Sequence, residues 1–356
     1  MAADPSELLK RYEPKMAKTV DLDRQMVTLR YSPCGKLLLA GDFDGMVRRW
    51  DANGEELQNL APLAGHGGWV TALTFHGDGH RVFTSDSWGQ LRAWPYAEAA
   101  PQPAWAVAQA HDGWIRAIAC SPDGQNVATC GSDKQIRVWS ADDGGKRHEF
   151  AAGEDVYSLA FHPSGALASG DLKGVVKHWD AAVGKCEREF DARGMYLYDR
   201  LQDVGGVRAL AFDKAGTTLV CAGSQPKSGA FVQGSPLVLW FDWQSGNLKH
   251  TLKLGGENDG FVYDMSLHQD GFLMAVSSGQ PGSGKLFFHS PDAEQPFFAA
   301  TTMANCHALA VHPGGYRLAV SATNSSSNGN GRQLNGNKEY PGNFSPLYFW
   351  DLPQSS

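Results

Sequence analysis

The sequence has 356 residues, and its 31 lysines and arginines against 38 aspartates and glutamates give a formal net charge of −7. This acidic balance, with no basic tract to neutralise phosphates, argues against direct nucleic-acid binding. No apolar run approaches the roughly 18 residues that a membrane-spanning helix needs, and residues 1–15 lack the apolar core of a signal peptide. We therefore expect a cytoplasmic protein that does not bind membranes and is monomeric on its own.

The chain begins with a short appendage, residues 1–15, in which Ser6–Arg11 has a helix-like pattern. Residues 17–22 (AKTVDL) then form a β-type run that has no partner in the segment after it. From there on the chain consists of short alternating runs separated by polar turns, and it contains 41 glycines in all. This pattern is typical of many short strands joined by tight turns.

Two series of landmarks recur along the rest of the chain. The first is a glycine that closes a polar turn, and it occurs at Gly35, Gly79, Gly124, Gly165, Gly216, Gly271 and Gly315. The second is an aromatic residue that ends a β-type run, and it occurs at Trp50, Trp94, Trp139, Trp179, Trp240, Phe288 and Trp350. Because the two series interleave one to one, we predict seven repeats, each with three strands before the aromatic residue and a fourth strand after it.

The last repeat has only four residues after its third strand, so it lacks a fourth strand of its own. Residues 17–22 are unpartnered, and we predict that they complete the last sheet and close a ring. Four-stranded units with apolar faces must stack on their neighbours, and radial stacking leaves only short edges. We therefore predict an all-β, seven-bladed propeller over residues 16–356, with four-stranded antiparallel blades.

The third repeat, His111–Trp139, is the most regular one. The runs IRAIAC and NVATC flank the turn SPDG, and QIRVW follows. Ala110-His111 stands where a Gly-His pair opens the unit, an Asp precedes the Trp by six residues, and Trp139-Ser140 stands where a Trp-Asp pair closes it. These features resemble those of WD40-repeat proteins.

The resemblance implies a hydrogen-bond chain from His111 through Thr129 to Trp139, with Asp133 orienting the histidine. The same residue types could form a catalytic triad, but they match a structural motif by position and no nucleophile elbow accompanies them, so we expect no enzyme. The other repeats depart from this pattern. The second keeps three of the four residues, with Trp88 at the position of Asp133, and the fourth has Lys173 there. We therefore expect one complete network, and the residues that the second repeat keeps are His66, Thr84 and Trp94.

Three patterns suggest chemistry that their context does not support. Gly279–Lys285 matches a phosphate-binding loop, but Leu286 replaces the Ser or Thr and a strand follows where a helix is needed, so we predict a turn. Asp42–Gly45 resembles the start of a calcium loop but lacks the later acidic ligands. The six cysteines show no metal-ligand spacing. We expect reduced, buried thiols, no metal and no cofactor, although Cys120 and Cys130 lie in neighbouring strands.

The landmark spacing is longer around repeats five and seven, and it locates three insertions, Ala192–Gly206, Ser224–Pro236 and Ala322–Pro346. In a meander, the connections between blades and those between second and third strands emerge on one face. All three insertions are therefore predicted on this face, which we call the insertion face. The opposite face, called the turn face, has seven short turns and is predicted to be structural.

The predicted binding site lies on the insertion face. The residues aligned at the starts of the first strands should point toward the mouth of the central channel, and they are Val27, Thr71, Arg116, Tyr157, Arg208, Tyr263 and His307. Aromatic residues lie nearby in the connecting segments at Trp69, Trp88, Trp114, Tyr196, Tyr198 and Phe261. Aromatic and arginine side chains dominate protein interfaces. Trp69 and Trp114 could equally pack against neighbouring loops, but as a group these residues favour a non-catalytic scaffold that binds a protein or peptide partner.

The alternative is a propeller enzyme, or a binder of a small ligand or metal, at the channel mouth. The mouth series itself contains no carboxylate and a single histidine, whereas hydrolytic metal sites need several convergent ligands. Four aspartates close to it in sequence keep this alternative open, and they are Asp155, Asp199, Asp203 and Asp264.

Overall fold

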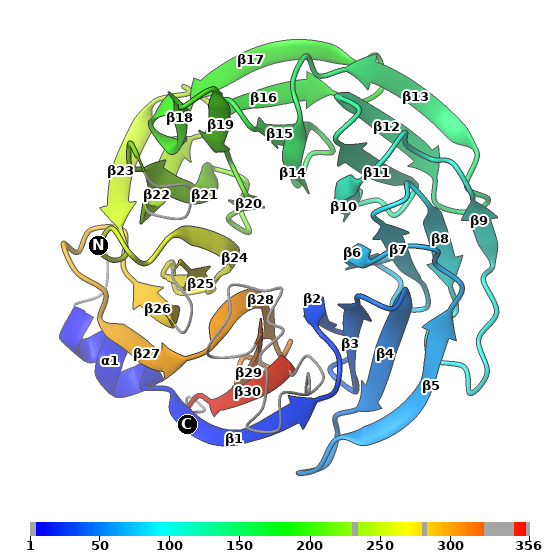
Figure 1. Cartoon of the computed structure of the whole chain (residues 1–356), viewed down its shortest axis with the longest axis horizontal. Coiled ribbons are helices and arrows are strands. Elements are labelled where there is room, and N and C mark those ends of the chain that lie inside the picture. The colour runs from blue at the N-terminus through cyan, green and yellow to red at the C-terminus, as the bar shows by residue number, and fades with distance from the viewer. Residues whose placement is uncertain (1–4, 230–233, 280–282, 324–344, 354–356) are drawn as a thin grey trace.

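The computed structural model describes residues 5–229, 234–279, 283–323 and 345–353. Within these ranges, seven four-stranded antiparallel sheets stand radially around a common centre, as predicted (Figure 1). The innermost strands are β2 (Met26–Tyr31), β6 (Val70–Phe75), β10 (Ile115–Cys120), β14 (Val156–Phe161), β20 (Ala209–Phe212), β24 (Phe261–Leu267) and β28 (Asn305–Val311). The second strands are β3 (Leu37–Asp42), β7 (Val82–Asp86), β11 (Asn126–Gly131), β15 (Leu167–Asp171), β21 (Thr218–Pro226), β25 (Leu273–Ser278) and β29 (Arg317–Thr323).

The third and fourth strands lie progressively farther from the centre. The third strands are β4 (Met46–Asp51), β8 (Leu91–Trp94), β12 (Gln135–Ser140), β16 (Val175–Asp180), β22 (Gly234–Asp242), β26 (Gly284–His289) and β30 (Ser345–Asp351). The outer strands of the first six blades are β5 (Gln58–Ala64), β9 (Trp105–Val107), β13 (Lys146–Ala151), β17 (Lys185–Asp191), β23 (Leu248–Lys253) and β27 (Phe298–Met303).

Strand β1 (Lys15–Leu22) is the outer strand of the seventh blade and closes the ring. It pairs antiparallel with β30 from Lys15 opposite Asp351 to Leu22 opposite Ser345. The predicted closing strand, residues 17–22, is therefore confirmed and begins two residues earlier. In Figure 1 the blue β1 lies against the red β30, which joins the two ends of the chain in one sheet.

Helix α1 (Pro5–Tyr12) packs against the last two blades. Leu8 and Tyr12 are buried in a cluster with Phe272 and Leu318. The Tyr12 hydroxyl donates a hydrogen bond to Asp270, and burial, together with this carboxylate, raises the pKa of Tyr12 to about 12. The apolar residues four positions apart thus fix the helix to the propeller. No helix in the described part of the chain is long and apolar enough to cross a membrane.

The blades hold together through apolar contacts between neighbouring sheets. Strands β7 and β15 are buried at every position, because both faces of a blade are covered by the adjacent blades. In one such contact, Phe83 and Leu91 of the second blade pack with Ile115 and Trp139 of the third. Each fully buried side chain of this kind contributes about 1.5–3 kcal/mol. The outer strands are mostly exposed, so the core lies between the blades.

The first insertion, residues 192–206, is more ordered than a loop. A short 3-10 helix (Arg193–Met195) leads into a hairpin of β18 (Tyr196–Asp199) and β19 (Gln202–Gly205), which forms a two-stranded sheet of its own. The second insertion lengthens β21 and β22 until Pro226 pairs with Gly234. Asp199 accepts hydrogen bonds from Ser228 and from the backbone N–H of Gly229, so these two insertions meet on one face. Most of the third insertion lies outside the described residues.

The patterns that resemble a phosphate-binding loop and a calcium loop both lie in connections between second and third strands. Gly279–Lys285 joins β25 to β26 of one sheet, so the prediction of a strand connection there is confirmed, although residues 280–282 lie outside the described part. Asp42 accepts hydrogen bonds from Arg48 and from two backbone N–H groups of its own turn. All six cysteines are free. Cys34 and Cys186 are exposed, which corrects the expectation of buried thiols.

Candidate functional site

The innermost strands share an irregularity that aims one side chain into the channel. In six blades the register between the first and second strands shifts by one residue near the start of the first strand. The residue left out of the ladder is Val27, Thr71, Arg116, Tyr157, Tyr263 or His307. A β-bulge of this kind redirects a side chain out of the regular alternation. In the fifth blade Arg208 directly precedes β20.

Aligning the first strands of the seven repeats had selected these seven residues, and all of them line one cavity of about 210 Å³ at the channel. The predicted convergence of the seven first-strand residues is therefore confirmed as a placement. Their part in binding stays a prediction.

Two arginines of the mouth lie over aromatic rings of their own or of neighbouring blades. The Arg116 guanidinium lies 4.9 Å from the ring centroids of both Trp114 and Tyr157. The Arg208 guanidinium lies 4.1 Å from Tyr157 and 5.2 Å from Phe261. Tyr157 thus contacts both cations. Such contacts contribute about 0.5–2 kcal/mol each, depending on how far water is excluded.

Further rings extend this series in both directions around the mouth. On one side Trp69 packs edge-on against Trp114 with centroids 5.3 Å apart, and it stacks on Phe43 at 4.1 Å with an interplanar angle of 2°. On the other side Tyr263 lies 6.3 Å from Phe261 and 5.2 Å from His307. We call this series the mouth arc, and its members are Phe43, Trp69, Trp114, Arg116, Tyr157, Arg208, Phe261, Tyr263 and His307.

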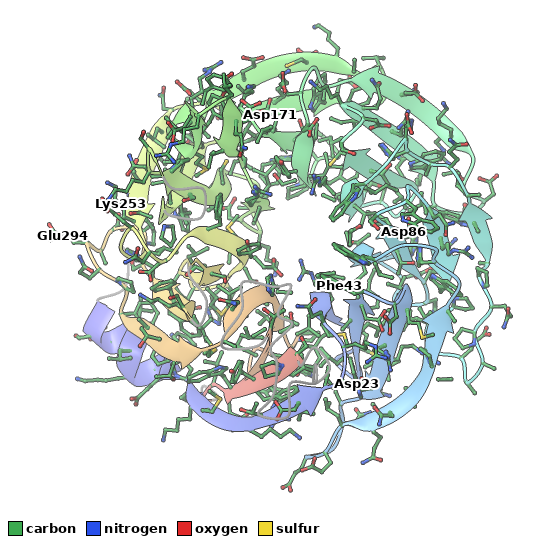
Figure 2. All side chains as sticks on the ribbon, viewed as in Figure 1. Asp23, Phe43, Asp86, Asp171, Lys253 and Glu294 are labelled. Carbon is green, nitrogen blue, oxygen red and sulfur yellow. The ribbon has the colours of Figure 1, made fainter. Side chains whose placement is uncertain are left out.

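Sequence reasoning missed Phe43. It lies in the turn between β3 and β4, and Figure 2 shows it beside the central opening. An aromatic residue between two aspartates in a polar turn was the available signal. The tryptophans of the arc do pack against neighbouring loops, as the alternative interpretation held, yet Trp69 and Trp114 each keep 36% of their surface exposed.

The charges of the mouth are unbalanced among the described residues. Neither the Arg116 nor the Arg208 guanidinium has a described hydrogen-bond or ion-pair partner, and Arg116 Nε is buried without one. Burial lowers the pKa of Arg208, and the nearby charge of Arg116 lowers it further. Arginine nevertheless stays protonated in proteins. The cavity is therefore lined by two positive charges with no acidic partner within the described part of the chain.

The remaining polar groups of the mouth are already engaged. Asp264, the single carboxylate among the described lining residues, accepts hydrogen bonds from Arg30 and from the backbone N–H groups of Met265 and Leu309. His307 Nε2 lies 3.2 Å from Thr323 Oγ1. Burial lowers the pKa of His307 to about 4, so this side chain is neutral at pH 7. Neither residue compensates the two arginines.

Six residues proposed from the sequence do not line the mouth cavity, and they are Trp69, Trp88, Trp114, Tyr196, Tyr198 and Phe261. Trp69, Trp114 and Phe261 belong to the mouth arc through their ring contacts, whereas the other three lie outside it. Trp88 is 68% exposed in the turn between β7 and β8, and Tyr198 is 59% exposed on the hairpin. Tyr196 donates a hydrogen bond to Asp203 and accepts one from Lys173. Lys173 also pairs with Asp203, which explains why lysine replaces the aspartate of the regular repeat: it anchors the inserted hairpin. Tyr196 and Tyr198 do not line the cavity.

The network expected in the third blade is present. Trp139 donates from Nε1 to Thr129 at 2.8 Å, Thr129 Oγ1 lies 2.7 Å from His111 Nε2, and His111 Nδ1 lies 2.9 Å from Asp133. Burial lowers the pKa of His111, so the histidine is neutral at pH 7, and its Nδ1 also lies 2.8 Å from Arg137 Nη1. The group is enclosed in the blade, as a structural brace would be.

The second blade has a network as well, so the expectation of a single one was wrong. Trp94 donates to Thr84 at 2.8 Å, and Thr84 lies 2.7 Å from His66 Nε2. Asp86, two residues before the expected position, lies 3.1 Å from His66 Nδ1. It reaches the histidine because its other oxygen accepts the backbone N–H groups of Trp88 and Gln90, which fixes the carboxylate at the strand end. Figure 2 shows Asp86 within this blade.

The turn face is less uniform than its short turns suggested. His76 Nε2 donates to the carbonyl oxygen of Gly124 in the next blade at 2.8 Å, and His162 donates to that of Gly216 at 2.8 Å. Their Nδ1 atoms face their own turns, where they lie 2.7 Å from Asp78 Oδ1 in His76 and 2.7 Å from Ser164 Oγ in His162. We call these contacts the histidine latches. They join the second blade to the third and the fourth to the fifth.

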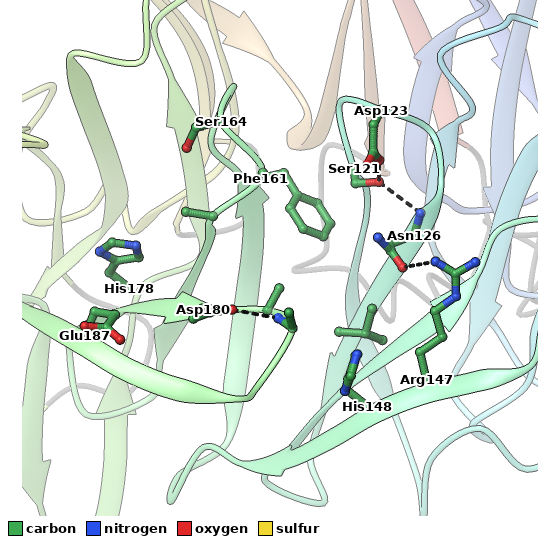
Figure 3. Close-up of a pocket in the computed structure, with 15 residues that line it drawn as sticks. Ser121, Asp123, Asn126, Arg147, His148, Phe161, Ser164, His178, Asp180 and Glu187 are labelled. Atoms are coloured by element: carbon green, nitrogen blue, oxygen red, sulfur yellow. Dashed lines mark hydrogen bonds between the residues drawn. The ribbon is translucent and has the colours of Figure 1, made fainter.

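A pocket opens at a junction that has no such latch. Ser121 stands in the third blade where His76 stands in the second, and a Cβ added to Gly165 of the fourth blade would meet nothing within 4 Å. The pocket beside them has a volume of about 500 Å³ (Figure 3). Its polar lining mixes both signs of charge, with Arg147, His148, His178, Asp180 and Glu187. This pocket was not predicted from the sequence.

Seven radial four-stranded sheets within the described ranges define a β-propeller. The family model described as "WD domain, G-beta repeat" matches residues 23–51, 57–95, 106–140 and 145–180, which span the first four blades. The chain thus carries WD40 repeats at four positions within a seven-bladed propeller, and three more divergent blades complete the ring. WD40 propellers are generally protein-interaction scaffolds without catalytic activity.

One relative shares a short segment with this chain. The "Probable serine/threonine-protein kinase PkwA" of Thermomonospora curvata is 42% identical over 72 residues. That segment is 20% of this chain and 8% of the relative. The similarity is therefore to a small part of that protein, and its name says nothing about the activity of this one.

Proposed function

We propose that this propeller is a non-catalytic interaction module that binds a protein or peptide segment at the channel mouth on the insertion face. The mouth arc carries the proposal. It brings aromatic and arginine side chains from all but one of the blades into one continuous surface, and these residue types supply most of the binding energy in protein interfaces. Cytoplasmic location and a monomeric state stay predictions from the sequence.

The bulged strands also support this function. A binding surface keeps its geometry best when its side chains project from regular elements rather than from loops. Arg116 and Tyr157 lie within β10 and β14, and their neighbours in the arc pack against them. The surface is thereby held in place before a partner arrives, which lowers the entropy cost of binding.

The alternative of a metal or small-ligand site has little support in the geometry. Asp155, Asp199 and Asp203 do not line the mouth cavity, and Asp264 is held by Arg30. Among the described residues, no three His, Cys, Asp or Glu side chains lie close enough to share a metal ion. The cavity, at about 210 Å³, is also smaller than typical small-molecule pockets of roughly 300–1,000 Å³.

The test replaces two exposed members of the arc, Trp69→Ala together with Trp114→Ala. Proteins captured from the source cell by the wild type and by this variant are quantified by mass spectrometry. We expect partners to be lost from the variant, because truncating an interface hot spot costs about 2 kcal/mol or more, a roughly 30-fold loss of affinity. Leu248→Ala, an exposed apolar residue on the outer strand β23, is the matched control and keeps the partners. An unchanged partner profile in the tryptophan variant would contradict the proposal.

A further inference from the structure

The two arginines of the mouth arc are held in a way that leaves their donors free. Aromatic rings cover Arg116 and Arg208, with Tyr157 shared between them. A guanidinium carries its five N–H donors in its plane, so a ring stacked on its face does not use them. Among the described residues no acceptor does so for either side chain. Two cations thus face one cavity with unused, preoriented donors.

The other titratable groups of the mouth do not neutralise the two arginines. Asp264 is saturated by Arg30 and by two backbone N–H groups, and His307 carries no charge at pH 7. Buried guanidinium donors without acceptors are costly, whereas a carboxylate or phosphate group that accepts two parallel N–H bonds recovers that cost. The site is therefore incomplete as the described residues leave it, and an anion completes it.

The volume of the cavity and the net charge of the chain indicate which kind of anion fits. A volume of about 210 Å³ holds a single side chain and its neighbours rather than a polymer. The chain as a whole carries a charge of −7, so an extended polyanion is repelled around this small positive spot. A short acidic element presented by a peptide satisfies both conditions.

We propose that the channel mouth recognises an anionic side chain of a partner peptide, and that Arg116 and Arg208 bind it together while Trp69, Trp114 and Phe261 contact the adjoining residues. This inference rests on the proposed interaction function and adds the chemistry of the ligand. The anionic group is a carboxylate of Asp or Glu, or a phosphate on a hydroxyl residue.

The probe is a displayed library of random 12-residue peptides, selected on the full-length chain. Unmodified peptides can supply only carboxylates, so enrichment of Asp or Glu at one position is the expected result. The best peptide is then synthesised with Glu, Gln or phosphoserine at that position, and its affinity is measured by fluorescence anisotropy. We expect the change from Glu to Gln to weaken binding by about tenfold to a hundredfold, since a charge-assisted hydrogen-bond pair is removed.

The matching protein variant is Arg116→Gln together with Arg208→Gln. It should bind the Glu and Gln peptides equally, because the partner of the carboxylate is gone and the two changes are coupled. The control, Arg147→Gln with Lys185→Gln, removes the same charge from exposed residues near the turn face and keeps the preference for Glu. Arg116→Lys with Arg208→Lys keeps the charge without the planar fork, and it should retain part of the preference. Thermal unfolding of each variant checks that it is folded, and the Glu to Gln change on the wild type tests the charge without any variant.

The outcomes separate the two proposals. Selected peptides without an acidic position, whose binding the tryptophan variant still abolishes, would overturn the anionic inference and leave the interaction function standing. Peptides that bind the tryptophan and arginine variants as well as the wild type would overturn both. A phosphoserine peptide that outcompetes the Glu peptide, and loses this advantage on the glutamine variant, supports the anionic inference with phosphate as the source.

Discussion

The histidine networks of blades two and three and the mouth arc contain the same kinds of side chain but arrange them in opposite ways. In the networks every polar atom between Trp94, Thr84, His66 and Asp86 has a partner inside the blade. In the arc, the guanidinium of Arg208 has aromatic neighbours and no described acceptor. Residue type alone does not distinguish a structural hydrogen-bond network from a binding site. The difference is whether the chain itself satisfies the polar groups.

This contrast also changes which repeat features matter for function. His111–Trp139 gathers His, Asp, Thr and Trp in one unit, yet its polar groups are enclosed and neutral or paired. The binding residues that we propose in the same blade are Trp114 and Arg116, and the bulge in β10 turns Arg116 toward the channel. Variants of the first set should therefore affect stability, and variants of the second set should affect binding.

The largest effect on stability is expected from Asp86→Ala. The substitution leaves His66 Nδ1 unpartnered in a buried site and removes the acceptor of the Trp88 and Gln90 backbone N–H groups. Each buried donor that is left without an acceptor costs about 1–3 kcal/mol, and this substitution leaves several of them. Urea unfolding followed by tryptophan fluorescence measures the loss. Asp142→Ala, at an aspartate with 81% of its side chain exposed, is the control and should change the free energy of unfolding by less than about 0.5 kcal/mol.

A second substitution asks whether the two networks are interchangeable. Asp86→Gly with Trp88→Asp gives blade two the residues that blade three has at Gly131 and Asp133. Because Asp133 reaches His111 from that position, we expect this double variant to recover at least about half of the stability lost in Asp86→Ala. A double variant no more stable than Asp86→Ala would show that Asp86 has a role that the aspartate position of the third blade does not provide.

The next largest effect is expected on the turn face, from Gly124→Ala. This glycine has a φ of +72°, and a Cβ there would lie 2.6 Å from His76 Nε2, so the substitution strains the backbone and displaces the latch. The expected cost is about 2–3 kcal/mol, of which about 1–2 kcal/mol is the left-handed conformation. Gly165→Ala, at a φ of +93° with open space around it, should cost only about 1–2 kcal/mol. Equal losses of stability in thermal or urea unfolding would mean that the latch contributes nothing.

The features predicted correctly from the sequence depend on local patterns. The turn glycines and closing aromatic residues set the number of blades, and the unpaired run at residues 17–22 identified the closing strand because the last repeat lacked one. The mouth series followed from aligning the first strands. Each of these needs only the order of residues along the chain and the rule that strands alternate direction.

The features that were missed depend on contacts across the fold. Phe43 joins the mouth arc because blade packing brings its turn against Trp69. Asp86 contacts His66 from a position that is occupied by Gly131 in the third blade. The one-residue bulges are visible only in the strand register. The pocket at Gly165 is lined by residues of two neighbouring blades, the third and the fourth. Spacing along the sequence carries no information on these distances.

The smallest effect on stability at neutral pH is expected for His307→Gln in the mouth. This substitution compares a histidine that has no acidic partner with the network histidines, each of which has an aspartate partner. Burial alone lowers the pKa of His307 to about 4, whereas in His66 and His111 burial also lowers the pKa but an aspartate partly opposes it. A neutral hydrogen bond to Thr323 is all that the substitution removes at pH 7, so the free energy of unfolding should fall by about 1 kcal/mol or less.

The pH dependence of this difference gives the fuller test. Because the pKa of His307 is lower in the folded than in the unfolded chain, where it is about 6.5, unfolding takes up a proton between these two values. The contribution of His307 to stability is therefore full above about pH 6.5, falls as the pH is lowered, and is lost by about pH 4. His307→Gln removes this share of the acid destabilisation, so the variant should gain on the wild type as the pH falls from 6.5 to 4. NMR titration of the His307 ring protons measures the pKa directly, and a midpoint near 6.5 in the folded protein would show instead that water or an anion reaches the ring and stabilises its charged form.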